Sequence, residues 1–554
     1  MTPQSDPEVA LLSSSNRRTT LREAIPLLFT VLFFAVLFSH LLSTHMLQPK
    51  ADGLYSAGTT WGDLAWHLSM ISNFVQRGSA AVKENPIYPG TKLSYPFVPD
   101  LISAWMVKSG LSLRVSLILP SLLAIVGFIA AMYVLARSMG AGTIGAISAL
   151  LLLLFNGSIF GTIYLWRDYH SSGASFASAV LRKDYSNIPE HNLWFSNFVC
   201  DYLLPQRAAD WGCLIGTLVV IWLWLYWKTS NQKNLLYAGV LLSSLPLVHF
   251  HTFAALSIVA GLLLLIELLV EGRQWIPTLR AWAWFFPPII LVALPQVLWI
   301  LPRQPGHFLR PVYGWMNAHE SIWWFWFKNM SPHIFIFALA CYFATRKVRT
   351  FYLASVALFG ISNLVIFQPY DYDNLKLMYW WFLLSSILTG LMFDKFVRGS
   401  RRVGIPLSLI ILATMISTGS VTVWRELHLS TQMFSFEDIE LANFVKDHTR
   451  TDAIFLTSDR HTNPIACLGG RRIVMGYRGW LWSHGLDYRV RERDVAEMYR
   501  GSVRTESLLK QYHVDYVLIE RDRIDEAHDN PEHFTAQFSI AYRSSNFTLV
   551  KVSP

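Results

Sequence analysis

Charged residues are scarce in this chain. Only 15% of its 554 residues are Asp, Glu, Lys or Arg, whereas 53% are apolar and the mean hydropathy is positive. A soluble domain usually carries about 25% charged residues, because its surface has to face water. The shortage of charge therefore excludes an ordinary soluble protein of this length and predicts a polytopic helical membrane protein.

Cysteines are also few, and they lie far apart. The four of them (Cys200, Cys213, Cys341 and Cys467) have neither metal-ligand nor disulfide spacing. The formal charge of +9 does not indicate nucleic-acid binding, because the basic residues lie mostly in short loops between apolar segments and no basic–aromatic module is visible. The expected surroundings are instead the lipid bilayer, where the abundant Trp and Tyr suit the membrane–water interfaces.

Long apolar runs predict about eleven transmembrane helices. They lie near residues 25–47, 114–135, 142–165, 213–227, 235–250, 252–270, 282–301, 333–344, 351–367, 377–393 and 404–423. Arg17, Arg18 and Arg22 precede the first run, so we expect a cytoplasmic N-terminus. Alternating from there puts the short basic loops inside and the long loops outside.

Three parts of the chain follow from this topology. Residues 1–24 form a cytoplasmic tail, residues 25–424 a transmembrane domain, and residues 425–554 an extracytoplasmic α/β domain. The long outer loops are 48–113, 166–212 and 302–330. In the last part we expect helices at 437–447, 490–500 and 506–512, and strands at 453–458, 471–476 and 516–521.

The stretch "TTWGDLAWHLSM", just after the first apolar run, combines an acid, an imidazole and two indoles. In a helix, Asp63 and His67 would share one face, next to Trp66. A carboxylate at the membrane rim can serve as a general base toward a hydroxyl. The other interpretation of Asp63 is a helix N-cap, since it follows a glycine where a helix begins.

The remaining candidates of the first two outer loops and of the helix ends are polar or aromatic. Tyr95 lies in a proline-rich loop and either lines a groove or packs the loop down. Arg207 either grips a phosphate as a bidentate fork or snorkels to the interface. His249 and His251, in "HFHTF", are better suited to line a cavity than to share a metal, because residues two apart on a helix point away from each other.

Two late motifs are expected on the same face. "PYDYDNLKLMYWW" carries Asp371, Asp373, Asn374 and Lys376 at the start of a helix, where acids also favour the helix dipole. Lys376 is a candidate for meeting a lipid-linked phosphate, and Asp373 and Asn374 for binding hydroxyls. "GYRGWLWSHGLDY" carries Trp480 and His484 in a loop that either docks on the membrane domain or closes over the site.

With these pieces in place, the chain resembles the GT-C class of integral-membrane glycosyltransferases. The likeness covers nearly the whole chain: many helices, a long first outer loop with an acid just after the first helix, and a trailing α/β domain. Four blocks carry it: "GDLAWHLSMI", "LLPQRAADWG", "PYDYDNLKLMYWW" and "GYRGWLWSHGLDY". The chain lacks the adjacent Asp-Glu of the protein O-mannosyltransferases and the WWDYG block of oligosaccharyltransferases, so the resemblance does not extend to a protein acceptor.

The resemblance implies inverting transfer of a sugar from a polyprenyl-phosphate donor to a glycan, lipid or other acceptor at the outer face. Asp63 would be the catalytic base, and Arg207 and Lys376 would stabilise the leaving phosphate. Because phosphate leaves readily, no acid partner is obligatory. Some members use a divalent metal, for which Asp63, His67 and Asp373 are the candidates here. The likeness also favours the cell (inner) membrane of a prokaryote. Two rival functions stay open, a transporter or flippase and a non-catalytic assembly protein. Transport usually leaves ionisable residues near helix centres, where this sequence has almost none.

Overall fold

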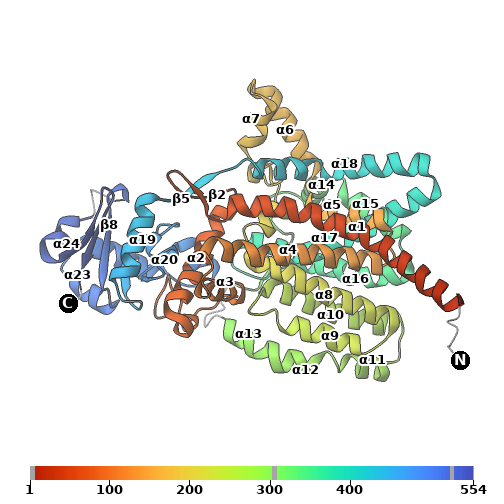
Figure 1. Cartoon of the computed structure of the whole chain (residues 1–554), viewed down its shortest axis with the longest axis horizontal. Coiled ribbons are helices and arrows are strands. Elements are labelled where there is room, and N and C mark those ends of the chain that lie inside the picture. The colour runs from red at the N-terminus through yellow and green to blue at the C-terminus, as the bar shows by residue number, and fades with distance from the viewer. Residues whose placement is uncertain (1–6, 302–307, 524–528, 553–554) are drawn as a thin grey trace.

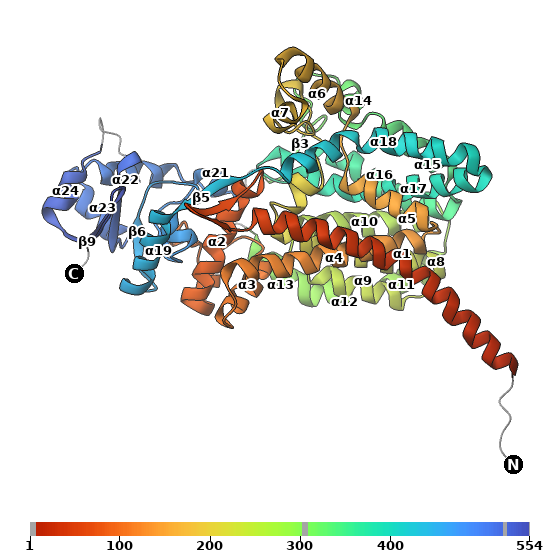
Figure 2. The same cartoon turned by 45° about the horizontal axis from the view of Figure 1, so that its top comes forward.

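The computed structural model describes residues 7–301, 308–523 and 529–552. Residues 302–307 of the expected outer loop 302–330 lie outside the described residues. So do residues 1–6 of the tail and the side chains of residues 7–23, among them Arg17, Arg18 and Arg22. The protein is elongated: a bundle of helices has the N-terminus at one end and the C-terminal α/β part beyond the other end (Figures 1 and 2).

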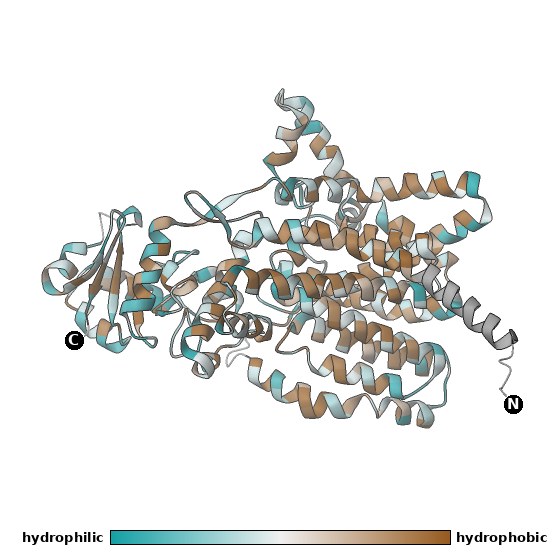
Figure 3. Ribbon diagram, in the orientation of Figure 1, coloured by the Kyte–Doolittle hydropathy of each residue, from teal (hydrophilic) through white to brown (hydrophobic). Residues whose placement is uncertain are grey.

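The bundle is built from helices that are apolar over most of their length, as the brown ribbons in Figure 3 show. Those of the first half are α1 (Pro7–His45), α4 (Leu113–Ser138), α5 (Thr143–Leu154), α8 (Arg207–Thr229), α9 (Lys233–Ser243) and α10 (Phe250–Leu269). The others are α11 (Trp275–Trp282), α12 (Phe286–Pro288), α13 (Leu294–Ile300), α14 (Ile322–Met330), α15 (His333–Phe343), α16 (Arg346–Ser362), α17 (Leu375–Gly399) and α18 (Arg401–Glu426). Helices α6 (Ile159–Ser172) and α7 (Phe176–Arg182) project from the bundle (Figure 1).

The expected count of eleven spans is not confirmed. In the described part of the chain, six helices are long and apolar enough to cross a membrane: α1, α4, α8, α10, α17 with the turn before it, and α18. The count rises to eight if the bent pairs α5–α6 and α11–α13 each form one span; they bend by 55° and 42°. Helices also stand at the other predicted places, but α9 and α15 have only 11 residues each, and one span needs about 20.

The tightest helix pair of the bundle is α5 with α17. A Cβ added to Gly390 would lie 2.1 Å from the carbonyl oxygen of Gly145, so both positions need glycine for the two backbones to approach. Asp394, buried on α17, accepts hydrogen bonds from the backbone N–H groups of Gly142 and Gly145. It thereby satisfies donors at the start of α5 that have no partner within their own helix.

The segment after α1 links the bundle to the C-terminal part. Strands β1 (Gln48–Lys50) and β2 (Gly53–Ser56) form an antiparallel sheet with β5 (Thr431–Ser435), which follows α18. Helices α2 (Thr60–Arg77) and α3 (Val98–Lys108) complete this segment. The Ser72 hydroxyl on α2 donates to the carbonyl of Cys467 at 2.7 Å, so α2 is fixed to the C-terminal part across nearly 400 residues of chain.

The C-terminal part contains a mixed five-stranded sheet in the order β7-β6-β8-β10-β9. Its strands are β6 (Ile454–Leu456), β7 (Arg472–Ile473), β8 (Tyr516–Glu520), β9 (Ser539–Arg543) and β10 (Phe547–Lys551). Its helices are α19 (Phe436–His448), α20 (Pro464–Cys467), α21 (Arg478–Ser483), α22 (Arg489–Tyr499), α23 (Thr505–Gln511) and α24 (Pro531–Gln537). The three predicted strands and three predicted helices are confirmed within a few residues, and the sheet adds the unpredicted hairpin of β9 and β10.

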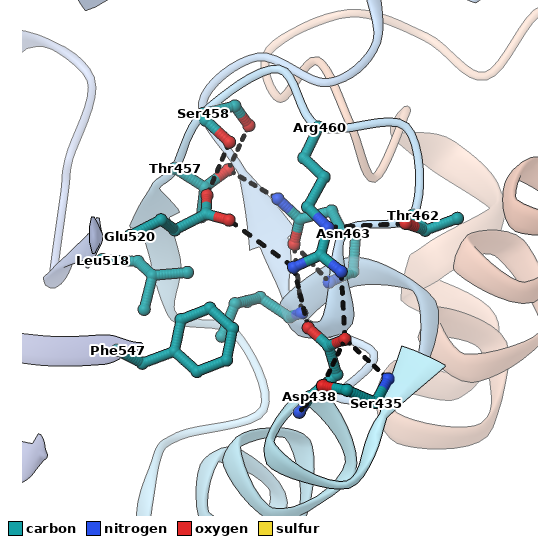
Figure 4. Close-up of polar contacts among 12 residues, drawn as sticks. Ser435, Asp438, Thr457, Ser458, Arg460, Thr462, Asn463, Leu518, Glu520 and Phe547 are labelled. Atoms are coloured by element: carbon teal, nitrogen blue, oxygen red, sulfur yellow. Dashed lines mark hydrogen bonds and ion pairs between the residues drawn. The ribbon is translucent and has the colours of Figure 1, made fainter. Parts of the chain in front are cut away.

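A charged network fixes the loop after β6 against α19 (Figure 4). Arg460 reaches both carboxylate oxygens of Asp438, at 2.7 and 2.9 Å, and Asp438 also closes a capping box with Ser435 at the start of α19. Ser458 donates to Glu520 at 2.5 Å. The first part of this loop is therefore held at Ser458 and Arg460, which matters because the next residue, His461, contacts Trp61 of α2.

The glycine contact between α5 and α17 gives a stability prediction. Gly390→Ala places a methyl group against backbone that has no room to retreat, and such overpacking costs about 1–3 kcal/mol. The matched control is Gly360→Ala on α16, where an added Cβ meets nothing within 4 Å. We expect thermal unfolding of the purified protein in detergent to begin at a lower temperature for the Gly390 variant only. Equal midpoints for both variants would contradict the close approach.

Candidate active site

Helix α2 presents Asp63 and His67 on one face, as the spacing predicts. The helix begins at Thr60, with Thr59 in the capping position, so Asp63 lies at the end of the first turn, not at the cap. The N-cap interpretation of Asp63 is therefore wrong. Within the part of the chain that the structure describes, the Asp63 carboxylate forms neither a hydrogen bond nor an ion pair, although its side chain is partly buried.

Three charged or polar groups act on Asp63. Burial raises the pKa of its carboxyl group; Lys376 and His67 lower it, and Asp373 raises it further. Lys376 comes from the first turn of α17, and Asp373 from the 3₁₀ turn just before it, so segments about 300 residues apart meet here. A free carboxylate beside a cation and an imidazole has the arrangement required of a base or of a hydroxyl-binding group.

The four charged or amide residues of the "DYDNLK" stretch have different surroundings. Asp373 pairs with Lys376 at 3.0 Å, and both side chains are partly exposed. Asp371 instead pairs with Arg310, away from Asp63. Asn374 is fully buried, accepting from Phe367 N–H and donating to two backbone carbonyls, so its amide holds the turn together. Of this motif, only Asp373 and Lys376 belong to the group around Asp63.

Behind α2, His67 begins a buried chain of polar contacts. Its Nδ1 donates to Oδ2 of Asp100 at 2.9 Å, and Arg207 donates to Oδ1 of Asp100 at 2.6 Å and to the Ser103 hydroxyl at 2.6 Å. The Arg207 side chain is only 1% exposed. This overturns the expectation that Arg207 grips a phosphate or snorkels to the interface: its guanidinium is used inside the protein, where it compensates Asp100 and thereby orients His67.

Aromatic rings cover the other side of the site. Trp66 packs edge-on against Tyr95 with 5.3 Å between centroids, and His484 lies 4.9 Å from both rings. Trp480 lies 6.0 Å from Trp66. Burial raises the pKa of Tyr95 well above its usual value and lowers that of His484 to about 4, so both side chains are neutral at pH 7. The aromatic loop of the C-terminal part therefore closes over α2.

The two histidines of "HFHTF" have separate partners. His249 is buried, with Nδ1 2.8 Å from the Thr252 hydroxyl, whereas Nε2 of His251 lies 2.6 Å from Oε1 of Gln368. Lys376 and Asp373 are the charges that act on His251, so this residue lines the same site. The ring centroids of His249 and His251 are 5.3 Å apart, and each imidazole bonds to a different partner.

A divalent metal does not fit these residues as they stand. Among the described residues, no group of three or more His, Cys, Asp and Glu side chains is placed to hold an ion. Of the three candidates, His67 is engaged by Asp100, Asp373 is engaged by Lys376, and only Asp63 is free. We therefore derive no step through a metal.

Several site residues escaped the sequence analysis. Asp100 follows the proline-rich loop of Tyr95 and Gln368 immediately precedes the "PYDYDNLKLMYWW" block, but neither stands out by type or spacing. His461, on the loop after β6, stacks on Trp61 with 4.6 Å between ring centroids and gives no signal in the sequence. These residues become recognisable only when α2, α3, α17 and the C-terminal part are seen together.

The Asp100–Arg207 pair yields a prediction about stability. Arg207→Gln leaves a buried carboxylate without its charge partner, a change that costs about 3–5 kcal/mol. The control is Arg310→Gln, whose ion pair with Asp371 is about 40% exposed (39% and 41%). It should cost at most about 1 kcal/mol. Thermal unfolding of the two purified variants separates these outcomes. The double variant Asp100→Asn/Arg207→Gln should recover part of the loss, and equal shifts for both single variants would refute the buried role.

Comparison with known proteins gives structural matches only. No protein-family model matches the chain, and no curated protein matches its sequence. The oligosaccharyltransferase of Archaeoglobus fulgidus, in its apo form, aligns over 89% of this chain and 69% of its own with 11% identity and a TM-score of 0.53. ArnT from Cupriavidus metallidurans, bound to undecaprenyl phosphate, aligns over 95% and 97% with 12% identity and a TM-score of 0.50. This chain is an integral membrane protein with the fold of the GT-C glycosyltransferases.

Proposed function

We propose that this chain is a membrane glycosyltransferase that moves a sugar from a polyprenyl-phosphate donor to an acceptor hydroxyl, with inversion at the anomeric carbon. The observation that carries the proposal is Asp63, a carboxylate without a hydrogen bond or ion pair among the described residues, beside Lys376 in a GT-C fold. We place the reaction at the outer face of the cell membrane, with residues 425–554 as an extracytoplasmic domain.

Asp63 is the general base of this reaction. It takes the proton of the acceptor hydroxyl while that oxygen attacks the anomeric carbon. The bond between this carbon and the phosphate oxygen breaks, and its electron pair leaves with the polyprenyl phosphate. A positioned base typically contributes about 10²–10⁴-fold to the rate. The raised pKa of the Asp63 carboxyl makes it a stronger base than an exposed aspartate, and a pKa nearer the working pH favours proton transfer.

Lys376 stabilises the charge that develops on the leaving phosphate. It is the cation that acts most strongly on Asp63, and its ammonium group is partly exposed, unlike the buried guanidinium of Arg207. Asp373 holds Lys376 at 3.0 Å and, with His251 and Gln368, lines the polar wall for sugar hydroxyls. ArnT, which shares the fold, was solved with undecaprenyl phosphate bound, which supports a polyprenyl-phosphate donor here.

Replacing the base tests the proposal. A deletion strain complemented with Asp63→Asn should fail to restore the glycoconjugate that the wild type restores, because an amide cannot take up the proton. The control is Asp447→Asn, an exposed acid on α19, which should restore it fully. Membrane levels of each protein are measured alongside. Complete restoration by the Asp63 variant would refute the proposal and favour a transporter or an assembly protein.

The pH dependence of transfer by purified protein gives a second test. The base acts only when deprotonated, and its pKa is raised by burial, so the rate should fall as the pH drops through a value above the usual 3.8. In Asp63→Asn, the small residual rate should lack this acidic limb. An unchanged limb in that variant would assign the titration to another group.

Lys376→Gln should weaken donor use more than acceptor use. A hydrogen bond to a charged group contributes about 1.5–3 kcal/mol. Its loss should therefore raise the KM for the lipid-linked donor by at least about tenfold. The KM for the acceptor should hardly change, and Lys376→Arg should retain most of the donor affinity. An effect on the acceptor alone would remove Lys376 from the phosphate site.

A further inference from the structure

A cavity lies in the C-terminal part, outside the group around Asp63. Its volume is about 450 Å³, within the usual range of small-molecule sites of about 300–1,000 Å³. It is bounded by the loop after β6, the end of β8, and helices α21 and α22. Its polar lining consists of Ser458, Asp459, Arg478, Glu492, Tyr499, Glu520 and Asp529.

The charge of this lining restricts the class of ligand. Arg478 is the one cation among these lining residues, and it is already paired with Asp459 at 2.9 Å and with Glu492 at 2.6 Å. Asp529 and Glu520 add two further carboxylates. A phosphate or carboxylate ligand would be repelled here, whereas neutral hydroxyl groups find several acceptors and one donor fork.

Aromatic rings on the loops next to this cavity contact helix α2. Tyr477 immediately precedes Arg478, and His461 follows Asp459 by two residues, so the same two loops carry both features. The ring centroid of His461 lies 4.9 Å from that of Tyr477, 4.6 Å from that of Trp480 and 4.6 Å from that of Trp61. Trp61 precedes Asp63 by two residues on α2, so the ring cluster joins these two loops to the helix that carries the base.

These rings are not an ordinary hydrophobic core. Tyr477 is 36% exposed, and Trp61, His461 and Trp480 are each partly exposed. Burial lowers the pKa of His461 to about 4, so its ring is uncharged at pH 7. Neutral ring faces pack well against the C–H faces of sugar rings, and neighbouring carboxylates accept bonds from the sugar hydroxyls.

We infer that the acceptor of the proposed reaction is a neutral oligosaccharide, bound in the cavity between α21 and α22 and guided by Tyr477, His461 and Trp480 toward Asp63. This inference rests on the proposed function only in calling the saccharide an acceptor, because binding of the saccharide does not require transfer. The C-terminal part thus supplies substrate recognition, and α2 supplies the chemistry.

The test is saccharide binding by the full-length protein purified in detergent. The probe is an array of defined neutral oligosaccharides (gluco-, galacto-, manno-, arabino- and rhamno-series) together with anionic ones that carry uronate or phosphate. The best ligand is then measured by isothermal titration. We expect a neutral series to bind, and Tyr477→Ala and Glu492→Gln each to weaken its binding by about tenfold or more. Tyr342→Ala, an exposed tyrosine on α15, is the control and should bind like the wild type.

Three results would overturn the inference: no binding of any neutral oligosaccharide, stronger binding of the anionic ones, or unchanged affinity in both the Tyr477→Ala and the Glu492→Gln variant. Because Glu492→Gln is nearly isosteric, it keeps the test valid if Tyr477→Ala does not fold. Asp63→Asn should bind the saccharide as the wild type does. If Asp63→Asn binds the saccharide and also restores the missing glycoconjugate, the proposed function fails and the saccharide site stands. If no neutral saccharide binds the wild type but Asp63→Asn abolishes transfer, the saccharide site fails and the proposed function stands.

Discussion

Asp100 is the buried charge on which the geometry of the candidate site depends. A carboxylate removed from water must be paired, and Arg207 at the start of α8 pairs it. The same carboxylate accepts the Nδ1 proton of His67, so α3, α8 and α2 are fixed relative to one another by one side chain. Helix α2 therefore carries Asp63 in a set direction relative to the bundle.

The opposite side of α2 is fixed by different forces. Ser72 donates to the Cys467 carbonyl, and strand β2 pairs with β5 at the exit of α18. Moving the C-terminal part away from α2 would break the pairing of β2 with β5 and expose contacts that are now buried. As a result, the rings of Trp480 and His484 are held over Trp66, and the site is composed of segments from the beginning, the middle and the end of the chain.

The local electrostatics suit a reaction that starts with a negative base and ends with a negative leaving group. Lys376 lowers the pKa of Asp63, and it is the cation that we propose to stabilise the leaving phosphate. Burial works in the opposite direction and keeps Asp63 basic. His484 adds polarity without adding charge, because burial lowers its pKa to about 4 and its ring is uncharged at pH 7.

The sequence by itself determined the membrane class, most element positions, and the residues of α2 and α17, because hydropathy and helical spacing are local properties. It also indicated Asp63, Lys376, Trp480 and His484 from their residue types. Only the tertiary structure decided that Asp63 is not a helix cap and that Arg207 pairs with the buried Asp100. It also decided that Asp371 pairs with Arg310 and that Asn374 bonds to the backbone. The partner of a buried charge depends on which distant segments of the chain pack against it, and a local sequence pattern does not contain that information.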